Sequence, residues 1–250
     1  MKTNVAFFYG CRSVEHEVSI ISAVQAMMAV DTEKYDITPV YVTKKGEMYT
    51  GEKLLTIEEY RDLPKLLSQC KKVFFVREGD RVLMKTDGKK GLFKKEEEPV
   101  QIDVAFPVVH GTNCEDGTIQ GYLEFLGVPY VGCDIISSAV GMDKAVFKDV
   151  LKSAGLPVLK ETLSLKNTEK IGYPLIVKPV NLGSSVGITK VNAPEELDEA
   201  LSLAISFADK ILVERAVTNL REINCSVLGD SSECKASVCE EPFMNDEILS

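Results

Sequence analysis

The sequence contains no tryptophan and only two histidines among its 250 residues. Its seven cysteines are odd in number and scattered, and none of them forms a Cys-x-x-Cys pair. A closed zinc site needs four well-spaced Cys or His ligands, and a disulfide framework needs paired cysteines. The sequence therefore disfavours both kinds of site and fits a reducing compartment.

Long apolar runs and an excess of basic charge are also missing. No stretch approaches the roughly 18 apolar residues of a membrane span, and the apolar run Val5–Tyr9 is too short for a signal-peptide core. The net charge is −9 and the isoelectric point is near 5, so the basic face typical of nucleic-acid binding is absent. We expect a cytoplasmic protein that binds neither nucleic acid nor membrane.

The remaining composition is that of a globular protein, with 45% hydrophobic and 27% charged residues. This length supports one or two domains with a sizeable core. Residues 5–9 and 36–42 are predicted strands, and Val18, Ile21, Val24 and Met28 recur at helical spacing between them. Ser13 is the expected helix cap. A strand, a helix and a strand in this order predict an α/β fold with a parallel sheet.

Further elements follow along the chain. We expect a hairpin from 73–76 and 81–84, and one strand over 102–109. A helix over 118–126 should end at Gly127, and another helix should span 143–154. The last predicted elements are strands at 174–179, 188–191, 211–214 and 222–228, with a helix over 194–208.

The segment Gly183–Gly187 (GSSVG) joins two predicted strands and is the first candidate for chemistry. Two glycines and two serines provide backbone donors and hydroxyls that can fold over phosphate oxygens. Neither G-x-x-x-x-G-K-[ST] nor G-x-G-x-x-G occurs in the chain. Taken alone, the segment is more often a glycine-rich hairpin turn.

Two lysines change that balance. Lys178 ends an apolar strand just before the loop, and Lys144 begins a predicted helix. Each lysine alone is more often a surface residue whose stem lies along the protein. Together with the loop they favour a nucleotide pocket, because a lysine is a common phosphate ligand.

Glu15 and Ser19 lie one helical turn apart after the first strand, and His110 ends another strand. Glu15 can simply complement the helix dipole, Ser19 can be an ordinary surface serine, and a lone histidine is more often structural. The alternative is functional, because open α/β sheets bind ligands at the carboxyl ends of their strands. A carboxylate at that edge suits a substrate ammonium group.

Glu214 and Glu222 flank a short turn between two predicted strands. They are either exposed charges at strand edges or acceptors for an adenine amino group and a ribose hydroxyl. In the second case the backbone of Arg215 to Val217 would complete an adenine-binding hinge.

Five ordered motifs together resemble the D-alanine–D-alanine ligase family. They are Gly10–Ser19 (GCRSVEHEVS), His110–Gly121 (HGTNCEDGTIQG), Met142-Asp143-Lys144, Lys178-Pro179 and Gly183–Gly187 (GSSVG). The resemblance spans nearly the whole chain. It implies a Rossmann-like N-terminal substrate domain over 1–134, an ATP-grasp central domain over 135–216, and the start of an incomplete C-terminal ATP-grasp domain over 217–250.

The resemblance also implies the role of each site residue. Glu15 would hold the amino group of the first D-alanine, Ser184 would link Glu15 to the loop, and Ser19 and His110 would line the D-alanine site. Lys144, Lys178 and Ser185 would contact the phosphates of ATP. Glu214, Arg215 and Val217 would hold adenine, and Glu222 would hold the ribose.

The implied activity is ATP-dependent ligation of two D-alanines through an acyl phosphate for peptidoglycan synthesis, with Mg²⁺ or Mn²⁺ as the metal. Two alternatives stay open: a sister ligase that uses D-serine or D-lactate as second substrate, and a nucleotide-binding module without catalysis. The resemblance favours a homodimer.

The chain departs from the family in three ways. Cys11 and Cys114 stand where the family commonly has glycine, and the turn from Glu214 to Glu222 is one residue longer. Family chains continue past the position of Ser250, and there they carry the metal ligands. We therefore expect the metal ligands beyond Ser250, none of them within this chain, and no turnover by these 250 residues alone.

Overall fold

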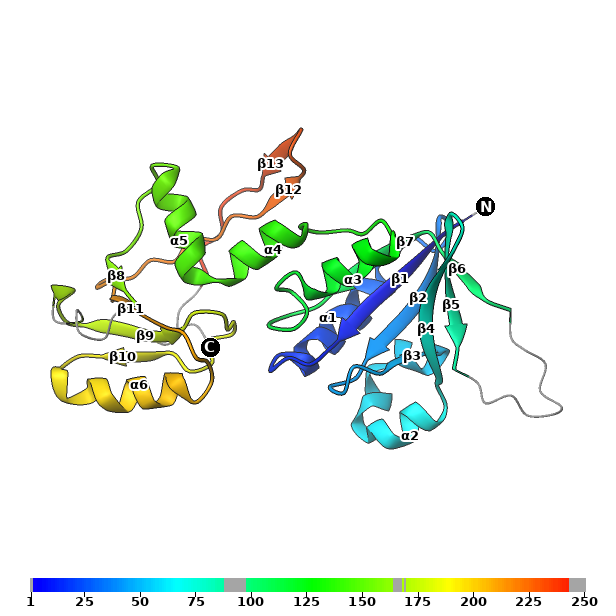
Figure 1. Ribbon diagram of the computed structural model, residues 1–250, viewed down its shortest axis with the longest axis horizontal. Helices are drawn as coiled ribbons and strands as arrows, with labels where there is room; N and C mark the ends of the chain where they lie inside the picture. Colours follow the sequence, from blue (N-terminus) through cyan, green and yellow to red (C-terminus); the bar gives the residue numbers. More distant parts are fainter. Residues whose placement is uncertain (1, 88–97, 164–167, 169, 243–250) are drawn as a thin grey trace. The chain divides into compact units, whose positions relative to one another are not determined.

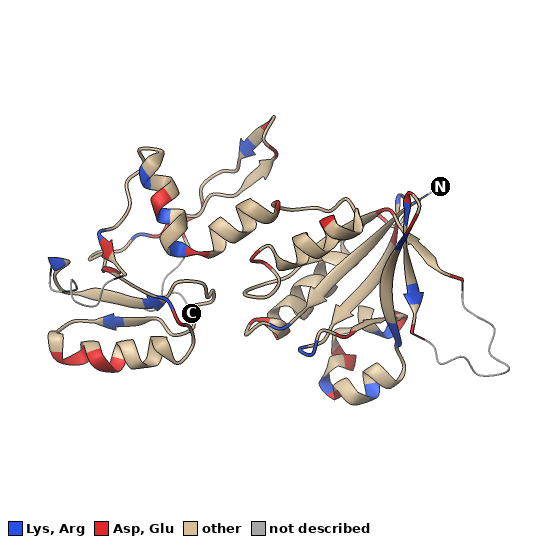
Figure 2. Cartoon of the chain, viewed as in Figure 1, with Lys and Arg blue, Asp and Glu red and all other residues tan. Residues whose placement is uncertain are grey.

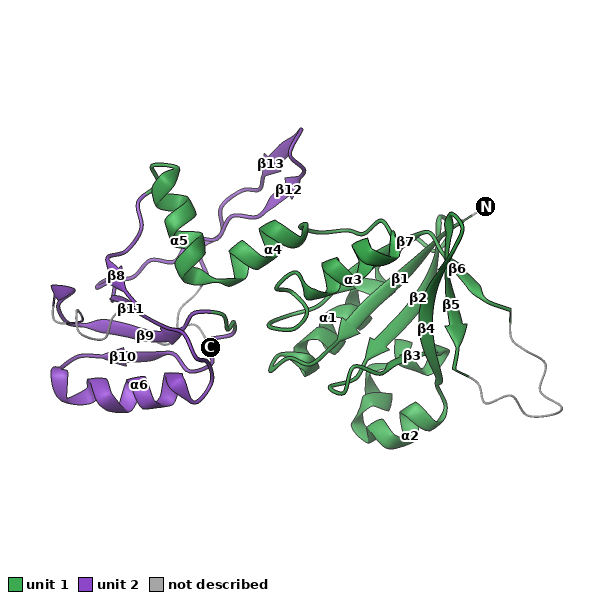
Figure 3. Cartoon of the chain, viewed as in Figure 1, with its two compact units in different colours: residues 1–156, 181–183 green, residues 157–180, 184–250 purple. Residues whose placement is uncertain are grey.

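The computed structural model describes residues 2–87, 98–163, 168 and 170–242. The chain forms two compact units (Figure 3): residues 1–156 with 181–183, and residues 157–180 with 184–250. This division into compact units does not test the predicted domain boundaries at residues 134 and 216, which stay predictions. The last residues of the predicted C-terminal segment, from 243 to Ser250, lie outside the described residues.

A parallel strand–helix–strand motif forms the centre of the first unit. Strand β1 (Thr3–Gly10) pairs in parallel with β2 (Tyr35–Val42) on one side and with β7 (Val104–Val108) on the other. Helix α1 (His16–Met28) makes the crossover from β1 to β2 (Figure 1). The predicted α/β motif is confirmed.

The first unit contains these further elements in chain order: β3 (Met48–Thr50), η1 (Glu52–Leu55), η2 (Ile57–Asp62), α2 (Leu63–Ser68), β4 (Lys71–Glu78), β5 (Arg81–Thr86), β6 (Val100–Ile102), α3 (Thr118–Leu126), α4 (Ile135–Met142) and α5 (Lys144–Ser153). β4 and β5 pair as the predicted antiparallel hairpin. α3 ends at Gly127, whose φ of +74° is the left-handed conformation expected of a glycine C-cap. α5 occupies most of the predicted helix 143–154, with Asp143 as its side-chain N-cap.

The predicted single strand over 102–109 is wrong, because the run divides at Asp103. Before it, β6 pairs antiparallel with β5; after it, β7 pairs with β1. The sheet order is β6-β5-β4-β3-β2-β1-β7, so β6 and β7, which follow each other in the chain, stand at opposite ends of that order. Asp103, between β6 and β7, is bonded to β1: its N–H donates to the Asn4 carbonyl (3.1 Å) and its carboxylate accepts from the Asn4 N–H (2.8 Å).

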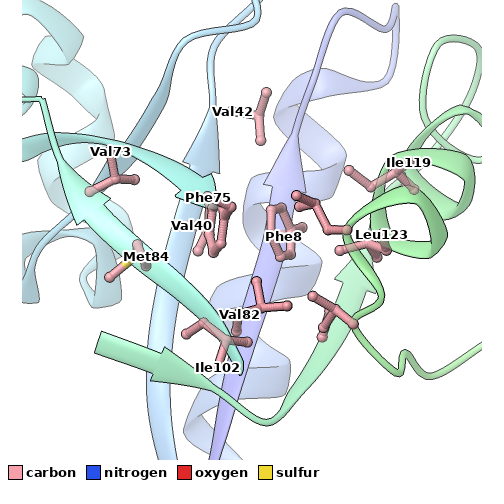
Figure 4. Packing of buried hydrophobic residues seen from close by; sticks show 14 of the residues in the cluster. Phe8, Val40, Val42, Val73, Phe75, Val82, Met84, Ile102, Ile119 and Leu123 are labelled. Carbon is pink, nitrogen blue, oxygen red and sulfur yellow. The ribbon is translucent and has the colours of Figure 1, made fainter. Parts of the chain in front are cut away.

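Both faces of β1 are buried, so alternate residues enter two different cores. Ala6 and Phe8 face a core shared with β2, β4, β5, β6 and α3, where the side chains converge (Figure 4). Val5, Phe7 and Tyr9 face the core beneath α1 and α2. This double burial explains why residues 5–9 form a continuous apolar run rather than an alternating one.

Two expectations about α1 are wrong. Its N-cap is Glu15 rather than Ser13, whose hydroxyl accepts a bond from the Glu15 N–H (3.0 Å). The predicted stripe is also displaced, since Val18 and Ile21 are each 48% exposed. The buried face consists of His16, Ser19, Ile20, Ala23, Val24 and Met27. Polar His16 and Ser19 belong to that face because both find hydrogen-bond partners, which an apolar pattern cannot reveal.

The second unit is a four-stranded antiparallel sheet of order β10-β9-β11-β8. Its elements are β8 (Glu161–Thr162), β9 (Leu175–Pro179), β10 (Thr189–Val191), η4 (Pro194–Glu196), α6 (Leu197–Ile205), β11 (Ile211–Arg215), and the separate hairpin of β12 (Val227–Gly229) and β13 (Cys234–Ala236). α6 packs on the sheet through Ala200, Leu201 and Ala204. Acidic residues gather at its N-terminal end (Figure 2), where they complement the helix dipole.

The last predicted strand, 222–228, is mostly wrong. Residues 222–226 form no strand, apart from a single bridge between Asn224 and Glu240, and β12 begins at Val227. Within the described ranges, no helix is both long and apolar enough to cross a membrane.

Candidate functional site

Glu15 lies where β1 ends and α1 begins, at the carboxyl edge of the parallel strands. The side chain is only 9% exposed. The turn before it is unusual, because Gly10 and Cys11 both have positive φ, +91° and +68°. A left-handed non-glycine residue costs about 1–3 kcal/mol, and such strain is typical of functional loops.

Two glycines allow the backbone to come close to the Glu15 carboxylate. A Cβ on Gly111 would lie 2.6 Å from Glu15 Oε2 and closer still to Ser13 Oγ. A Cβ on Gly183 would lie 2.9 Å from the same Oε2. The carboxylate is thus held in a cradle of backbone that only glycine permits, and its position is narrowly defined.

Ser19 is fully buried beneath this turn. Its hydroxyl accepts a bond from the Gly10 N–H (2.8 Å) and donates one to the Val108 carbonyl (2.6 Å). The serine thereby joins the ends of β1 and β7 to α1. In this structure it braces the strand ends that carry Glu15 and His110.

His110 follows β7 and is half-buried. Its Nε2 shares a hydrogen bond of 3.1 Å with Ser22 Oγ on α1. The next residues form a tight turn, in which Glu115 Oε2 accepts a bond from the Gly111 N–H (2.7 Å). The structure therefore brings Glu15, Ser19 and His110 together at one edge of one sheet, as the order of the motifs predicts.

Cys11 and Cys114, which the resemblance sets at positions where the family commonly has glycine, lie in these two turns. Both thiols are buried in one core cluster. A hydrogen bond with Cys114, together with burial, raises the pKa of the Cys11 thiol far above its ordinary value. A thiol that stays protonated is a poor nucleophile, so buried Cys11 is suited to packing in this core.

Lys144 is the first residue of α5, and its Nζ donates a hydrogen bond to the carbonyl of Leu182. Leu182 directly precedes the glycine-serine loop. Asp143 caps the helix by accepting from the N–H groups of Ala145 and Val146, each at 3.0 Å. The lysine thus lies next to the start of the loop, where the sequence predicts a phosphate contact.

The loop itself connects consecutive antiparallel strands β9 and β10, so it is a hairpin connection. Ser184, Ser185 and Gly187 all have positive φ, at +47°, +57° and +70°. Gly187 needs to be glycine, because a Cβ would lie 2.9 Å from Phe207 and 3.0 Å from Pro179. The hairpin interpretation and the phosphate-loop interpretation are compatible, because a turn that connects two strands can also bind phosphate through its backbone N–H groups.

Lys178 on β9 and Glu214 on β11 form an ion pair, with Nζ donating to Oε1. The two side chains are 16% and 6% exposed. Lys178 lies opposite Leu212 and Ile176 lies opposite Glu214 in the antiparallel ladder, so the lysine and the glutamate are diagonal neighbours on one face. Because the pair is largely buried, removing one partner would leave an uncompensated charge.

A cavity of about 680 Å³ opens beside this ion pair. Its lining residues are Leu159, Ile176, Lys178, Lys190, Glu214, Arg215, Ala216, Val217, Thr218, Asn219, Leu220 and Glu222. Five predicted nucleotide residues meet here: Lys178, Glu214, Arg215, Val217 and Glu222. Ser184 and Ser185 belong to the same unit but do not line this cavity.

The segment after β11 has the features of a hinge for a planar base. The Arg215 N–H is bonded to the Lys160 carbonyl and the Ala216 N–H to the Pro174 carbonyl. The backbone of Val217, by contrast, makes no hydrogen bond to any residue that the structure describes. Val217 lines the cavity together with apolar Leu159 and Ile176.

Sequence reasoning missed Leu159, Ile176 and Lys190 as lining residues. Lys190 lies opposite Ile176, which in turn lies opposite Glu214, so these three form one row across β10, β9 and β11. Figure 2 shows the basic residues of β9 and β10 on neighbouring strands. The sequence shows the alternation of side chains along each strand, but this alternation predicts neighbours on adjacent strands only when the register of the strands is known.

No cluster of three His, Cys, Asp or Glu side chains suited to a metal ion occurs in the part of the chain that the structure describes. Ser250, after which the metal ligands are expected, lies outside the described residues. The expectation of ligands beyond Ser250 therefore stays a prediction, and we assign no step to a metal.

Two protein-family models match the chain. The family model described as "D-ala D-ala ligase N-terminus" matches residues 4–133, and the one described as "D-ala D-ala ligase C-terminus" matches residues 136–249. Together they cover nearly the whole chain.

Curated relatives agree with the family models. A D-alanine–D-alanine ligase from Thermosipho melanesiensis is 41% identical over 90% of this chain and 62% of its own length. One from Thermoanaerobacter sp. is 43% identical over 99% of this chain and 69% of its own length. The chain thus spans 62% to 69% of these two relatives.

Solved structures show the same fold. The VanG D-Ala:D-Ser ligase from Enterococcus faecalis superposes with a TM-score of 0.78 at 33% identity, covering 96% of this chain and 70% of that one. The D-alanine–D-alanine ligase from Coxiella burnetii gives 0.80 at 30% identity, covering 96% and 68%. The predicted α/β fold of ATP-grasp type is confirmed.

Proposed function

We propose that this chain, which belongs to the D-alanine–D-alanine ligase family, takes part in the ATP-dependent joining of two D-alanine molecules. The dipeptide would serve peptidoglycan synthesis in the bacterial cell wall. Since ATP is the energy source, the proposed location is the cytoplasm. A homodimer remains the proposed assembly.

The observation that carries the proposal is the cavity around Lys178 and Glu214. It combines a largely buried ion pair, an unbonded Val217 backbone and apolar walls. An adenine ring needs a flat apolar slot, one acceptor for its amino group and one backbone donor for its ring nitrogen. Glu214 and Val217 provide these, Arg215 lies between them, and Glu222 at the rim would take the ribose hydroxyls.

Glu15 would bind the ammonium group of the first D-alanine. A carboxylate accepting from an ammonium ion makes a charge-assisted hydrogen bond, which is stronger than a neutral one. The cradle of Gly111 and Gly183 fixes that carboxylate, and His110 would line the same site. In this proposal Ser19 acts by bracing the strand ends and not by touching substrate.

The reaction would proceed in two steps. A carboxylate oxygen of the first D-alanine attacks the γ-phosphorus of ATP, the bond to the β-γ bridging oxygen breaks, and ADP leaves with an acyl phosphate formed. The amine of the second D-alanine then attacks the acyl carbon and loses a proton as inorganic phosphate departs. The products are one dipeptide, one ADP and one phosphate.

Phosphoryl transfer depends on positioning and on charge neutralisation. Lys144 and Lys178 would supply positive charge to the phosphates, with Ser185 and the loop backbone as donors. Acyl phosphates hydrolyse in water, so the site must exclude solvent during the reaction. The loop Gly183–Gly187 is the proposed cover, and Ser184 would connect it to Glu15. Mg²⁺ or Mn²⁺ would supply further charge neutralisation at the phosphates.

A second candidate is the sister activity with D-serine or D-lactate as second substrate. The similarity to a D-Ala:D-Ser ligase at 33% identity supports this second candidate. A nucleotide-binding module without catalysis is the candidate from another class.

One experiment separates the three. The natural protein, purified from its host cell, is incubated with ATP and D-alanine, alone or with D-serine or D-lactate. The products are identified by mass spectrometry. D-alanyl-D-alanine with equal ADP is the expected result. A mixed product as the main species would favour the sister ligase, and nucleotide binding without any ligated product would favour the module.

A further inference from the structure

The Gly10–Cys11 turn, which precedes Glu15, is held in place by hydrogen bonds involving both the N–H and the carbonyl of Cys11. Cys11 has a φ of +68°, which residues other than glycine rarely adopt. Its N–H donates to the Val42 carbonyl on β2 (2.7 Å), and its carbonyl lies 2.5 Å from His16 Nδ1. Such a conformation persists only when its surroundings fix it.

His16 connects this turn to the sheet. The ring is 3% exposed, and its second nitrogen, Nε2, lies 2.9 Å from the Tyr41 hydroxyl. Tyr41 is fully buried on β2, and the two rings meet edge to face at 5.5 Å. A Cβ on Gly10 would lie 3.1 Å from His16 Cε1 and 3.0 Å from Tyr41 Cε2, so both rings press against the turn.

The partners determine where the proton sits on the ring. A carbonyl oxygen can only accept, so Nδ1 must carry the hydrogen that it donates to Cys11. In the neutral ring Nε2 is then an acceptor, and the Tyr41 hydroxyl donates to it. Both ring nitrogens are satisfied inside the protein, which leaves His16 none to offer a substrate.

We propose that His16 is a positioning residue for substrate binding: its Nδ1–H holds the strained Gly10–Cys11 turn and thereby fixes the carboxylate of the adjacent Glu15. This inference rests on the proposed function, in which Glu15 binds the ammonium group of D-alanine. His16 directly follows Glu15, and Glu15 is confined by Gly111 and Gly183. A small shift of the turn would therefore move the carboxylate out of its cradle.

Three substitutions separate the hydrogen bond from simple packing. His16→Asn places an amide N–H near the position of Nδ1 and keeps the bond to Cys11. His16→Phe keeps a buried ring without any donor. Tyr41→Phe removes only the hydroxyl that supports Nε2. The Michaelis constants for D-alanine and for ATP are measured from ADP release in the protein as its host cell makes it.

We expect His16→Phe to raise the constant for D-alanine about tenfold or more, since even a displacement of about 1 Å weakens a positioned contact strongly. The constant for ATP should stay unchanged, His16→Asn should recover most of the loss, and Tyr41→Phe should fall between them. Equal impairment by Asn and Phe, or a parallel rise of both constants, would overturn the proposal.

A measurement on the unsubstituted protein tests the geometry independently of activity. The nitrogen chemical shifts of His16 report which ring nitrogen carries hydrogen, and we expect a proton on Nδ1. A ring without hydrogen on Nδ1 would overturn the proposed role even if the enzyme is active. Conversely, a proton on Nδ1 in a protein that neither binds nor ligates D-alanine would overturn the proposed function, and the role of His16 in substrate binding with it.

Discussion

At the scale of single residues, Glu15 and Glu17 provide a natural comparison. Glu15 is buried in its glycine cradle, whereas Glu17 is exposed and paired with Lys44 at 2.7 Å. They stand two residues apart at the same helix end. In the proposed function Glu15 meets the substrate ammonium group and Glu17 does not, so neutralising each carboxylate in turn separates substrate binding from helix electrostatics.

We predict that Glu15→Gln weakens D-alanine use and leaves ATP binding nearly unchanged. Loss of a charge-assisted hydrogen bond costs about 1.5–3 kcal/mol, or roughly a tenfold to hundredfold rise in the Michaelis constant. Glu17→Gln is the control and should change neither constant appreciably. An effect of Glu15→Gln confined to ATP would remove Glu15 from the D-alanine site.

A second prediction uses two glycines with the same backbone conformation. Gly111 and Gly46 have φ values of +82° and +81°, but a Cβ meets Glu15 and Ser13 at Gly111 and nothing within 4 Å at Gly46. Both alanine variants should lose about 1 kcal/mol of folding stability from strain. Gly111→Ala alone should also lose D-alanine affinity. Equal affinities in the two variants, measured by calorimetry, would show that the cradle is not needed.

Lys178 gives a third prediction, concerning the nucleotide. Lys178→Met keeps the aliphatic stem but removes the charge, so ATP binding should weaken more than adenosine binding. A lost phosphate contact predicts about a tenfold difference or more. Exposed Lys235 on β13 serves as the control, and Lys235→Met should bind both ligands normally. Equal losses for ATP and adenosine, by titration calorimetry, would place Lys178 away from phosphate.

The sequence predicted residue types at the site better than their relations. Glu15 and Lys178 stand in recognisable motifs, and Glu214 ends a predicted strand before a short turn, so each could be singled out from the sequence as a candidate. The ion pair between Lys178 and Glu214 depends on the register of β9 and β11, which single-sequence patterns do not contain. The bracing role of Ser19 likewise depends on β7, which is 89 residues away.

At the level of elements, a glycine marked one helix end correctly: α3 ends at Leu126, with Gly127 as its C-cap. The start of α5 is one residue later than predicted, because Asp143 is its N-cap rather than its first residue. The run 102–109 failed because nothing in its apolar pattern marks Asp103 as the change of partner strand. The expected strand 222–228 failed for a different reason: residues 223 to 226 are exposed, and among them only Asn224 forms a bridge, to Glu240, within the described residues.

The loop between β9 and β10 can be tested as an element. Gly187→Ala should displace the loop, because its Cβ would meet Phe207 at 2.9 Å and Pro179 at 3.0 Å. Gly155→Ala is the control, since φ is similar (+74° against +70°) and nothing lies within 4 Å. We expect weaker ATP binding only in Gly187→Ala. If both variants bind ATP alike in titration calorimetry, the loop does not shape the phosphate site.

For the whole molecule, buried tyrosines should lower the free energy of unfolding at high pH. Burial raises the pKa of Tyr41 to about 12, with the charge of Glu17 as a smaller cause. Burial likewise raises the pKa values of Tyr9 and Tyr60, whose hydroxyls share a bond of 2.6 Å. In the unfolded chain tyrosine ionises near pH 10.

The sign of the effect follows from these values. Below about pH 10 the tyrosines are neutral in both states, and their contribution to stability is complete. Above it the unfolded chain releases protons that the folded chain retains, so the free energy of unfolding should fall between about pH 10 and 12. Urea midpoints followed by circular dichroism measure this, and Tyr60→Phe should reduce the slope whereas Tyr35→Phe, at a 39% exposed residue, should not. A flat profile would contradict the burial of these hydroxyls.

We propose that one chain carries a D-alanine site at Glu15 and a nucleotide site at Lys178 and Glu214. A crystal structure of the protein with ADP and D-alanine would locate both ligands. We predict adenine against the Val217 backbone with its amino group on Glu214, the diphosphate within hydrogen-bonding distance of Lys178, and the D-alanine ammonium on Glu15. Density for ADP outside the cavity that Lys178 and Glu214 line, or for D-alanine away from Glu15, would contradict the account.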